Sequence, residues 1–315
     1  MTLRITFCCP GASPDPWIAE LARALPQAEL EVWSPGAPPR ADYALVWSPP
    51  QRFIDEQPQL RGLFNTGAGV DALLRLRLPP GLPIVRLEDA GMAVQMAEYV
   101  CHALIEDFRQ FQGLREQQTQ GLWRLPPAPD RSAYPVGVMG LGVLGRRVAQ
   151  ALRAFDFSVH AWTRTRPGDA CAADLTLHVG EGGLDGFLAA CQAVVCLLPL
   201  TPATENILNR RHLSRLRRGA HVVNVARGAH LVDEDLIALL DEGHLGGATL
   251  DVFRQEPLPP GHPFWTHPRI RITPHTSART LRSTAVEQIV GKIAQAAAGV
   301  PWPQIGGWVD PARGY

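Results

Sequence analysis

The chain has 315 residues, a length typical of about two domains with room for buried cores. Hydrophobic residues make up 46% of it and charged residues 19%, a composition that excludes a disordered chain. The 30 Lys and Arg residues balance the 30 Asp and Glu residues, so no overall field draws the protein to nucleic acid or to an anionic membrane.

No part of the sequence predicts a membrane segment or a signal peptide. No apolar run approaches the roughly 18 residues that a membrane-spanning helix needs. The N-terminal residues MTLRITFCCP lack a long apolar segment followed by a small-residue cleavage site, and we interpret them as a first strand. We therefore expect a cytoplasmic protein without a membrane partner.

The cysteines predict neither a metal site nor a disulfide, because no CxxC pair and no zinc-like spacing occurs among them. Two of them fall in apolar runs typical of central strands, where cysteine behaves as a small hydrophobe. These two are Cys8 and Cys196; the other four are Cys9, Cys101, Cys171 and Cys191.

Short apolar runs alternate with amphipathic segments over the first hundred residues. The apolar runs include LRITFCC, LEVWSP, DYALVWSP and LPIVRLED. Strands that alternate with helices form parallel sheets with right-handed crossovers. This region therefore predicts a doubly wound α/β domain.

One long amphipathic helix is predicted from Gly91 to about Gln120. Apolar residues recur there at near-fourfold spacing and form a single stripe that should face a core. The stripe consists of Met92, Met96, Val100, Leu104, Phe108 and Phe111. The stretch LPPAPD at 125–130 then ends the pattern and predicts a surface loop.

A second alternation begins at YPVGVMGLGVLG and predicts a second doubly wound parallel sheet. Its later apolar runs are SVHAWTR, AVVCLLP, AHVVNVAR, GATLDVF and IRITPH. A final helix is expected from Leu281 to about Ala298. Such a terminal helix could return to the first domain.

The segment VGVMGLGVLGRRVAQAL has the pattern of a strand, a Gly-x-Gly-x-x-Gly turn and a helix. Gly140 permits a tight turn, Gly142 lets the backbone approach a pyrophosphate, and Gly145 lets helix and strand pack closely. Val143 and Leu144 open the helix, whose free N–H groups favour an anion. This context predicts a dinucleotide site; the alternative is a glycine turn without a ligand.

The second strand of this unit ends in HAWTRTRP, where an NAD site usually has an acidic residue. Thr163, Arg164 and Arg166 stand there instead. A guanidinium offers a planar fork suited to the 2'-phosphate of NADPH, which a carboxylate would repel. NADPH is therefore the expected cofactor, with solvated surface arginines as the alternative reading.

Three residues that can carry acid-base chemistry follow later strands. Arg227 suits a carboxylate or keto oxygen, His275 can transfer a proton near neutral pH, and Glu256 can orient that imidazole. Each has a purely structural alternative when taken alone. Their positions just past successive strands favour function, because ligands bind at the carboxyl ends of parallel strands.

The glycine motif, NVARG, DVFRQEPLP and TPH, in that order and spacing, resemble the D-isomer-specific 2-hydroxyacid dehydrogenase family over essentially the whole chain. The segments NTGAGVDALL, DAGMAVQMAEYV, WTRTRP and ARGY resemble an NADPH-using subgroup of it that reduces glyoxylate and hydroxypyruvate. The missing acid after the second cofactor strand departs from the broader family and agrees with that subgroup.

The resemblance implies two doubly wound domains: a flavodoxin-like substrate domain, residues 1–98 and 282–315, and an NADP-binding Rossmann domain, residues 99–281. It implies Arg227 and His275 as catalytic and substrate-binding residues, with Glu256 supporting His275. No metal is required. Further cofactor contacts are expected at Pro199, Val225, Ala226 and Asp251.

The glycine-rich loop NTGAGVD follows an apolar strand and exposes backbone N–H groups that can receive a carboxylate. The resemblance implies that this loop binds the substrate carboxylate through Ala68, Gly69 and Val70, with Asn65 beside them. A plain connecting turn is the alternative. Trp47 ends the preceding strand and could wall a small pocket or belong to the core.

The expected activity is thus NADPH-dependent reduction of glyoxylate to glycolate and of hydroxypyruvate to D-glycerate, by a homodimer. One alternative is a reductase of a bulkier 2-keto acid or a 3-phosphoglycerate-type dehydrogenase. The other is a non-catalytic, dinucleotide-sensing corepressor, which the Arg, Glu and His constellation disfavours.

Overall fold

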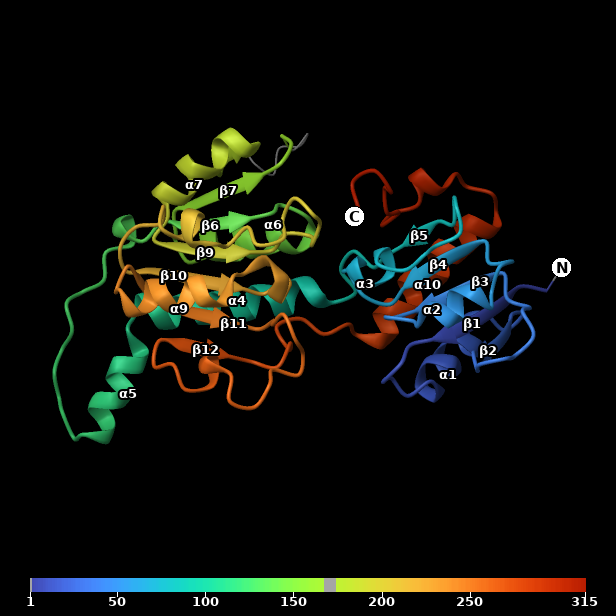
Figure 1. The fold of residues 1–315 in the computed structure, drawn as a ribbon, viewed down its shortest axis with the longest axis horizontal. Helices are drawn as coiled ribbons and strands as arrows, with labels where there is room; N and C mark the ends of the chain where they lie inside the picture. Colours follow the sequence, from blue (N-terminus) through green and yellow to red (C-terminus); the bar gives the residue numbers. More distant parts are fainter. Residues whose placement is uncertain (1, 167–173) are drawn as a thin grey trace. The chain divides into compact units, whose positions relative to one another are not determined.

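The computed structural model describes residues 2–166 and 174–315 (Figure 1). The chain divides into two compact units: unit 1 is Met1–Gly91 with Thr280–Tyr315, and unit 2 is Met92–Arg279. Both divisions lie earlier than the expected ones after residues 98 and 281. The first is earlier because helix α4 (Met92–Phe108) packs along α6 (Val143–Ala154) and belongs to unit 2 as a whole.

The described residues of unit 1 form a five-stranded parallel sheet in the order β2-β1-β3-β4-β5, which is the flavodoxin-like order. Every residue of the inner strands β3 and β4 and all but the first residue of the inner strand β1 are buried, as expected for a parallel sheet covered on both faces. The strands are β1 (Arg4–Cys8), β2 (Glu29–Val32), β3 (Tyr43–Val46), β4 (Gly62–Asn65) and β5 (Ile84–Val85). The helices are α1 (Asp15–Ala24), α2 (Gln51–Asp55), α3 (Asp71–Leu74) and α10 (Arg282–Ala297), and α10 packs against α1.

Unit 2 contains, within its described residues, a seven-stranded parallel sheet in the order β12-β11-β10-β9-β6-β7-β8. Counted within the unit this order is 7-6-5-4-1-2-3, the Rossmann order with one added strand. The strands are β6 (Val136–Met139), β7 (Val159–Thr163), β8 (Thr176–Val179), β9 (Ala193–Cys196), β10 (Ala220–Asn224), β11 (Leu245–Leu250) and β12 (Ile270–Ile272). Two doubly wound parallel-sheet domains are therefore confirmed.

In the described part of unit 2, helices cover both faces of the sheet. Besides α4 and α6 they are α7 (Leu184–Ala190), α8 (Arg210–Leu213) and α9 (Asp233–Asp241), and α5 (Phe111–Thr119) follows α4. The described residues also form the short 3₁₀ helices η1 (Arg131–Ala133), η3 (Glu181–Gly183), η4 (Gly228–His230), η5 (Pro263–Trp265) and η6 (Trp302–Gln304).

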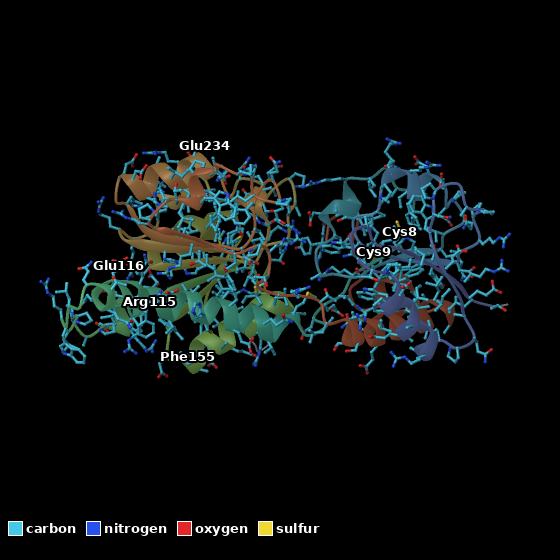
Figure 2. All side chains as sticks on the ribbon, turned by 90° about the horizontal axis from the view of Figure 1, so that it is seen from below. Cys8, Cys9, Arg115, Glu116, Phe155 and Glu234 are labelled. Carbon is cyan, nitrogen blue, oxygen red and sulfur yellow. The ribbon has the colours of Figure 1, made fainter. Side chains whose placement is uncertain are left out.

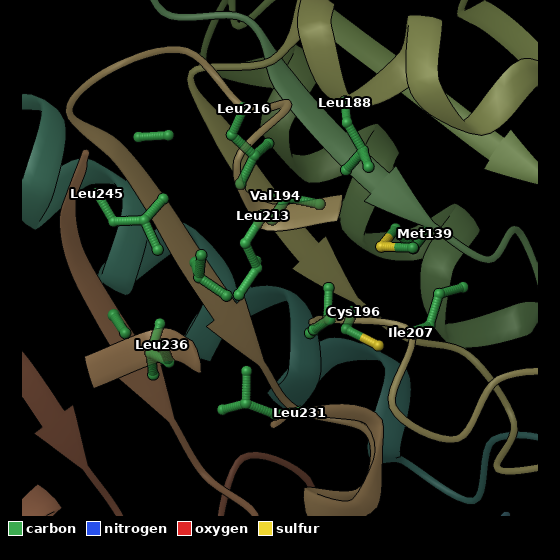
Figure 3. Close-up of a cluster of buried hydrophobic side chains, with 14 of the residues drawn as sticks. Met139, Leu188, Val194, Cys196, Ile207, Leu213, Leu216, Leu231, Leu236 and Leu245 are labelled. Carbon is green, nitrogen blue, oxygen red and sulfur yellow. The ribbon is translucent and has the colours of Figure 1, made fainter. Parts of the chain in front are cut away.

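Alternate residues of the inner strands of unit 2 pack into two hydrophobic clusters on opposite faces of the sheet, because successive side chains of a strand point to opposite faces. Val194 and Cys196 join the cluster that contains Leu213 (Figure 3). Val195, between them, joins the cluster on the face that α4 and α6 cover. The prediction that Cys196 lies in a buried central strand is confirmed.

The single long helix expected from Gly91 to Gln120 is wrong, because the chain breaks at Gln110, whose φ is 52° and ψ 37°. The apolar stripe explains the break: α4 buries its stripe down to Phe108, whereas no residue of α5 is buried. Because no buried side chain anchors α5 to the sheet, this helix projects away from the rest of unit 2 (Figure 1). The expected loop at 125–130 follows it in the chain.

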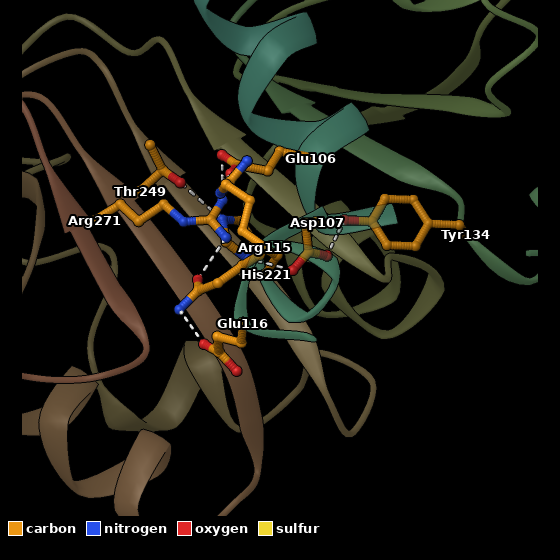
Figure 4. A network of polar contacts seen from close by, with 9 residues as sticks. Glu106, Asp107, Arg115, Glu116, Tyr134, His221, Thr249 and Arg271 are labelled. Atoms are coloured by element: carbon orange, nitrogen blue, oxygen red, sulfur yellow. Dashed lines mark hydrogen bonds and ion pairs between the residues drawn. The ribbon is translucent and has the colours of Figure 1, made fainter. Parts of the chain in front are cut away.

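Polar contacts hold the base of α5 (Figure 4). Glu106, at the end of α4, pairs with Arg115 of α5 and, at 2.6 Å, with Arg271 of β12. Beside it, Asp107 accepts a hydrogen bond from the hydroxyl of Tyr134, and its other carboxylate oxygen lies 3.0 Å from Nδ1 of His221.

Within the described residues, no helix combines the length and apolar character that crossing a bilayer requires.

Candidate functional site

Four of the segments singled out in the sequence lie at one edge of the unit 2 sheet. The glycine turn follows β6, and the segments with Arg227, Glu256 and His275 follow β10, β11 and β12. Parallel strands bring their carboxyl ends to the same edge, which is where doubly wound sheets bind ligands.

The glycine turn has the backbone that a bound dinucleotide requires. Gly140 has a φ of 100°, a conformation that other residues rarely adopt. A Cβ on Gly145 would lie 2.0 Å from the carbonyl oxygen of Gly140, so only glycine lets helix and turn pack this closely. A Cβ on Gly142 would meet no described atom within 4 Å, which leaves room for a ligand at the N-terminus of α6, where Val143 and Leu144 begin the helix.

The end of β7 fits a phosphate. The Thr163 hydroxyl is buried and has no hydrogen-bond partner among the described residues. Arg164 and Arg166 follow it and are both exposed, while Pro167 and Cys171 lie outside the described residues. Two arginines that directly follow the strand suit an anion with several acceptor oxygens.

Asn224 shapes the turn that carries Arg227. Its side chain donates to the carbonyl of Arg227 at 2.9 Å and accepts from the N–H of Ala226 at 3.2 Å. Asn224 was not among the expected site residues, although a polar residue at the end of an apolar strand was the available signal. A Cβ on Gly228 would lie 1.9 Å from the carbonyl carbon of Phe253, so this glycine lets the turn touch the loop that carries Glu256.

Glu256 and His275 form a hydrogen-bonded pair. Oε2 of Glu256 lies 2.8 Å from Nδ1 of His275, and Oε1 accepts from the N–H of Phe253 at 2.9 Å. Because the carboxylate only accepts, Nδ1 carries a proton and Nε2 is left for a substrate. The side chain of His275 is 41% exposed and that of Glu256 is 36% exposed, so a small molecule can reach them.

The surroundings keep Glu256 ionised. Burial raises the pKa of Glu256, but the hydrogen bonds from His275 and the Phe253 N–H, together with the positive charge of Arg227, outweigh burial, and the pKa is lowered. An ionised carboxylate at this distance accepts the Nδ1 hydrogen of His275 and fixes the orientation of the ring. The pair can therefore exchange a proton with a substrate oxygen through Nε2.

Replacing Glu256 with glutamine should lower the turnover number by about tenfold. The variant loses the ionised carboxylate that accepts from Nδ1 of His275, so the imidazole is held less firmly and its proton transfer slows. The measurement is kcat at neutral pH. Glu242→Gln, the same change in a carboxylate bonded to Arg210, is the matched control and should keep the wild-type kcat; full turnover in Glu256→Gln would contradict the pairing.

The remaining expected cofactor residues also follow strands, but Asp251 is used inside the protein. Asp251 is fully buried, and its oxygens accept hydrogen bonds from Thr273, Thr276 and Ser277. The structure thus brings this carboxylate to the loop that carries His275. Pro199 follows β9, and Val225 and Ala226 follow β10.

In unit 1, the loop after β4 folds around the side chain of Asn65. That buried amide donates to the carbonyls of Gly67 at 2.9 Å and Gly69 at 2.8 Å. The ring of Trp47 lies directly against Gly67, since a Cβ there would be 2.3 Å from it. Trp47 is 37% exposed, which places it at the surface beside this loop.

The backbone of the same loop offers hydrogen-bond donors. Among the residues that the structure describes, none accepts from the N–H groups of Ala68, Gly69 or Val70. Consecutive N–H groups with free hydrogens attract an anion such as a carboxylate.

No group of three or more His, Cys, Asp or Glu side chains among residues 2–166 and 174–315 has the arrangement of a metal site. The described cysteines are free and buried; Cys8 and Cys9 lie inside unit 1 (Figure 2). Burial raises the pKa of Cys8 and of Cys196 to about 12, so both stay as thiols.

The chain matches a protein-family model, that of the D-isomer specific 2-hydroxyacid dehydrogenase, NAD binding domain, over residues 101–277. Similar proteins include the glyoxylate/hydroxypyruvate reductase A of Yersinia enterocolitica, 41% identical, and that of Serratia proteamaculans, 42% identical. Each alignment covers 99% of this chain and 100% of the relative.

Two solved structures are similar to this chain over nearly its whole length. A D-isomer specific 2-hydroxyacid dehydrogenase from Xanthobacter autotrophicus, in complex with NADPH and MES, is 36% identical, with a TM-score of 0.92 over 100% of both chains. An NADPH-dependent glyoxylate/hydroxypyruvate reductase from Sinorhizobium meliloti, in complex with NADP and sulfate, is 31% identical, with a TM-score of 0.90 over 99% of this chain and 100% of that one.

Proposed function

The chain belongs to the D-isomer specific 2-hydroxyacid dehydrogenase family, and we propose that it reduces glyoxylate to glycolate and hydroxypyruvate to D-glycerate with NADPH. The observation that carries the proposal is the Glu256–His275 pair at 2.8 Å, at the same sheet edge as the glycine turn. The names of the relatives with 41% and 42% identity support the substrate pair.

NADPH, when bound, supplies a hydride to the keto carbon of the substrate. His275 donates the proton from Nε2 to the keto oxygen, and Glu256 keeps the imidazole oriented and protonated. Arg227 polarises the keto group and holds the substrate carboxylate through its guanidinium. All three side chains come from loops that the ends of β10, β11 and β12 position.

The cofactor is assigned to the residues whose environment fits its charges. The turn at Gly140 and Gly142 and the N–H groups at Val143 and Leu144 would receive the pyrophosphate. Thr163, Arg164 and Arg166 would hold the 2'-phosphate. Pro199, Val225 and Ala226 would line the remainder of the cofactor site.

In unit 1, the N–H groups of Ala68, Gly69 and Val70 would bind a carboxylate. Asn65, with its amide hydrogens used within the loop, would act by keeping the loop in shape. Trp47 packs against that loop and would limit the size of the substrate.

The test is a steady-state assay of NADPH oxidation with 2-keto acids of increasing side-chain size. We expect kcat/KM to be highest for glyoxylate and hydroxypyruvate and to fall for branched substrates. A preference for a bulky 2-keto acid would replace the proposed substrates. NADPH binding without turnover of any keto acid would indicate a dinucleotide sensor instead.

We propose further that the protein is a homodimer whose contacts include the segment 109–130. This segment exposes Trp123 and Leu125 at 100% and 95%, a large apolar surface for a single chain in water. Replacing both with serine should convert a species of twice the chain mass into one of single mass in analytical ultracentrifugation. Phe155→Ser, at an exposed apolar residue elsewhere, should leave the mass unchanged; a double variant that stays dimeric would contradict this contact (Figure 2).

A further inference from the structure

His275 is held in an unusual backbone conformation. Its φ is 51°, in the left-handed region that residues with a Cβ seldom occupy. A non-glycine residue keeps such a conformation only when surrounding contacts impose it. The contacts that impose it therefore also decide where the imidazole lies.

Asp251 supplies these contacts to the loop that carries His275. Its Oδ1 accepts from the hydroxyl of Thr273 at 2.5 Å and from the N–H of Thr276 at 2.8 Å, and its Oδ2 accepts from the N–H of Ser277 at 2.8 Å. Its backbone carbonyl accepts from the N–H of His275 at 2.9 Å. One fully buried residue thus binds the loop on both sides of His275.

Tyr99 extends this arrangement to helix α4. Its hydroxyl oxygen lies 2.5 Å from Oγ1 of Thr273. Thr273 has one hydroxyl hydrogen, which goes to the carboxylate of Asp251, so Tyr99 must be the donor to Thr273. Burial raises the pKa of Tyr99 to about 12, with the nearby Asp251 charge adding to the rise and the Thr273 hydrogen bond opposing it, so the phenol keeps its hydrogen.

We propose that Tyr99, Thr273 and Asp251 form a chain of positioning residues that fixes the backbone of His275 and thereby aims its imidazole. The order of donors is Tyr99 to Thr273 to Asp251, with the loop N–H groups completing the shell of the carboxylate. Removing the Tyr99 hydroxyl leaves Thr273 free to turn away from Asp251. The role as a positioning chain in reduction rests on the proposed function.

Tyr99→Phe should lower kcat for glyoxylate by about three- to tenfold, the equivalent of one lost hydrogen bond, while KM and the Kd for NADPH change less than about twofold. Thr273→Val should have the same effect and Thr273→Ser should restore turnover.

Tyr134→Phe is the matched control, since it removes a buried phenol of the same unit whose hydroxyl donates to Asp107 (Figure 4). It should lower the melting temperature comparably and leave kcat unchanged. Full turnover in Tyr99→Phe, or equal losses in both tyrosine variants, would overturn the proposal.

An NMR spectrum of the His275 imidazole tests the positioning without turnover, using the signals that are lost in His275→Asn. The chemical shifts of the ring protons should change in Tyr99→Phe and stay in place in Tyr134→Phe. If the wild type reduces no keto acid, the proposed function fails, while this change in the spectrum still decides the positioning role. Unchanged chemical shifts in Tyr99→Phe would overturn that role whatever the substrate is.

Discussion

His275→Ala should lower kcat for glyoxylate reduction by about 10²- to 10⁴-fold and leave the affinity for NADPH nearly unchanged. The imidazole is the group that the structure pairs with an ionised carboxylate and leaves with an accessible Nε2. Its loss removes the proton donor in the transition state, whereas the residues assigned to the cofactor lie in other segments. Steady-state kinetics give kcat, and a fluorescence titration with NADPH gives the affinity for the cofactor.

Two further variants separate chemistry from folding. His275→Asn places a residue that tolerates the left-handed conformation at the same position and should lose turnover equally. His267→Ala removes an imidazole that lies 3.4 Å from Asp241. His267 precedes β12, the strand that leads to His275, and the variant should keep wild-type turnover. Half or more of the wild-type kcat in His275→Ala would remove His275 from the role of proton donor.

The fold could be predicted because its determinants are local. Apolar runs such as AVVC and AHVVN are buried on both faces in β9 and β10, and amphipathic segments lie between the strands. This alternation is what a parallel sheet requires. The edge strand β8 was missed because its four residues are partly exposed and show no apolar run.

The position of the site could also be predicted, since the carboxyl ends of parallel strands share an edge whatever the details of packing. The contacts that shape the site could not. Asn224 folding back on Arg227, or Gly228 lying against Phe253, depends on how two loops meet in space. Asp251 illustrates the limit: its place after β11 predicts a ligand contact, and only the structure shows its oxygens binding the His275 loop.

The break between α4 and α5 shows why a regular spacing of apolar residues can mislead. Phe108 and Phe111 continue the stripe on paper, but the chain turns at Gln110 between them. Beyond that point the polar residues outnumber the apolar ones, and burial no longer outweighs the freedom of the segment to leave the sheet. The exposed Trp123 that follows is the basis for expecting a second copy there.

Arg164→Ala should weaken NADPH binding by about ten- to a hundredfold and leave NADH binding almost unchanged. The hydrogen bonds of a guanidinium to a phosphate are worth roughly 1.5 to 3 kcal/mol, which corresponds to that loss in affinity. NADH has no phosphate at the 2' position, so it loses nothing. The loss for NADPH should also shrink as salt is added, because salt screens an exposed ion pair.

The measurement is titration of both cofactors into wild type, Arg164→Ala, Arg166→Ala and a matched control. Arg153→Ala serves as the control, because it removes an exposed arginine at the far end of α6, where Arg153 pairs with Asp174 at 2.8 Å. We expect this control to bind both cofactors like the wild type, and Arg166→Ala to show the smaller of the two losses. Equal weakening of NADH and NADPH in Arg164→Ala, or a wild type that binds both equally tightly, would show that neither arginine reads the 2'-phosphate. The buried Thr163 hydroxyl beside them would then need another ligand to satisfy it.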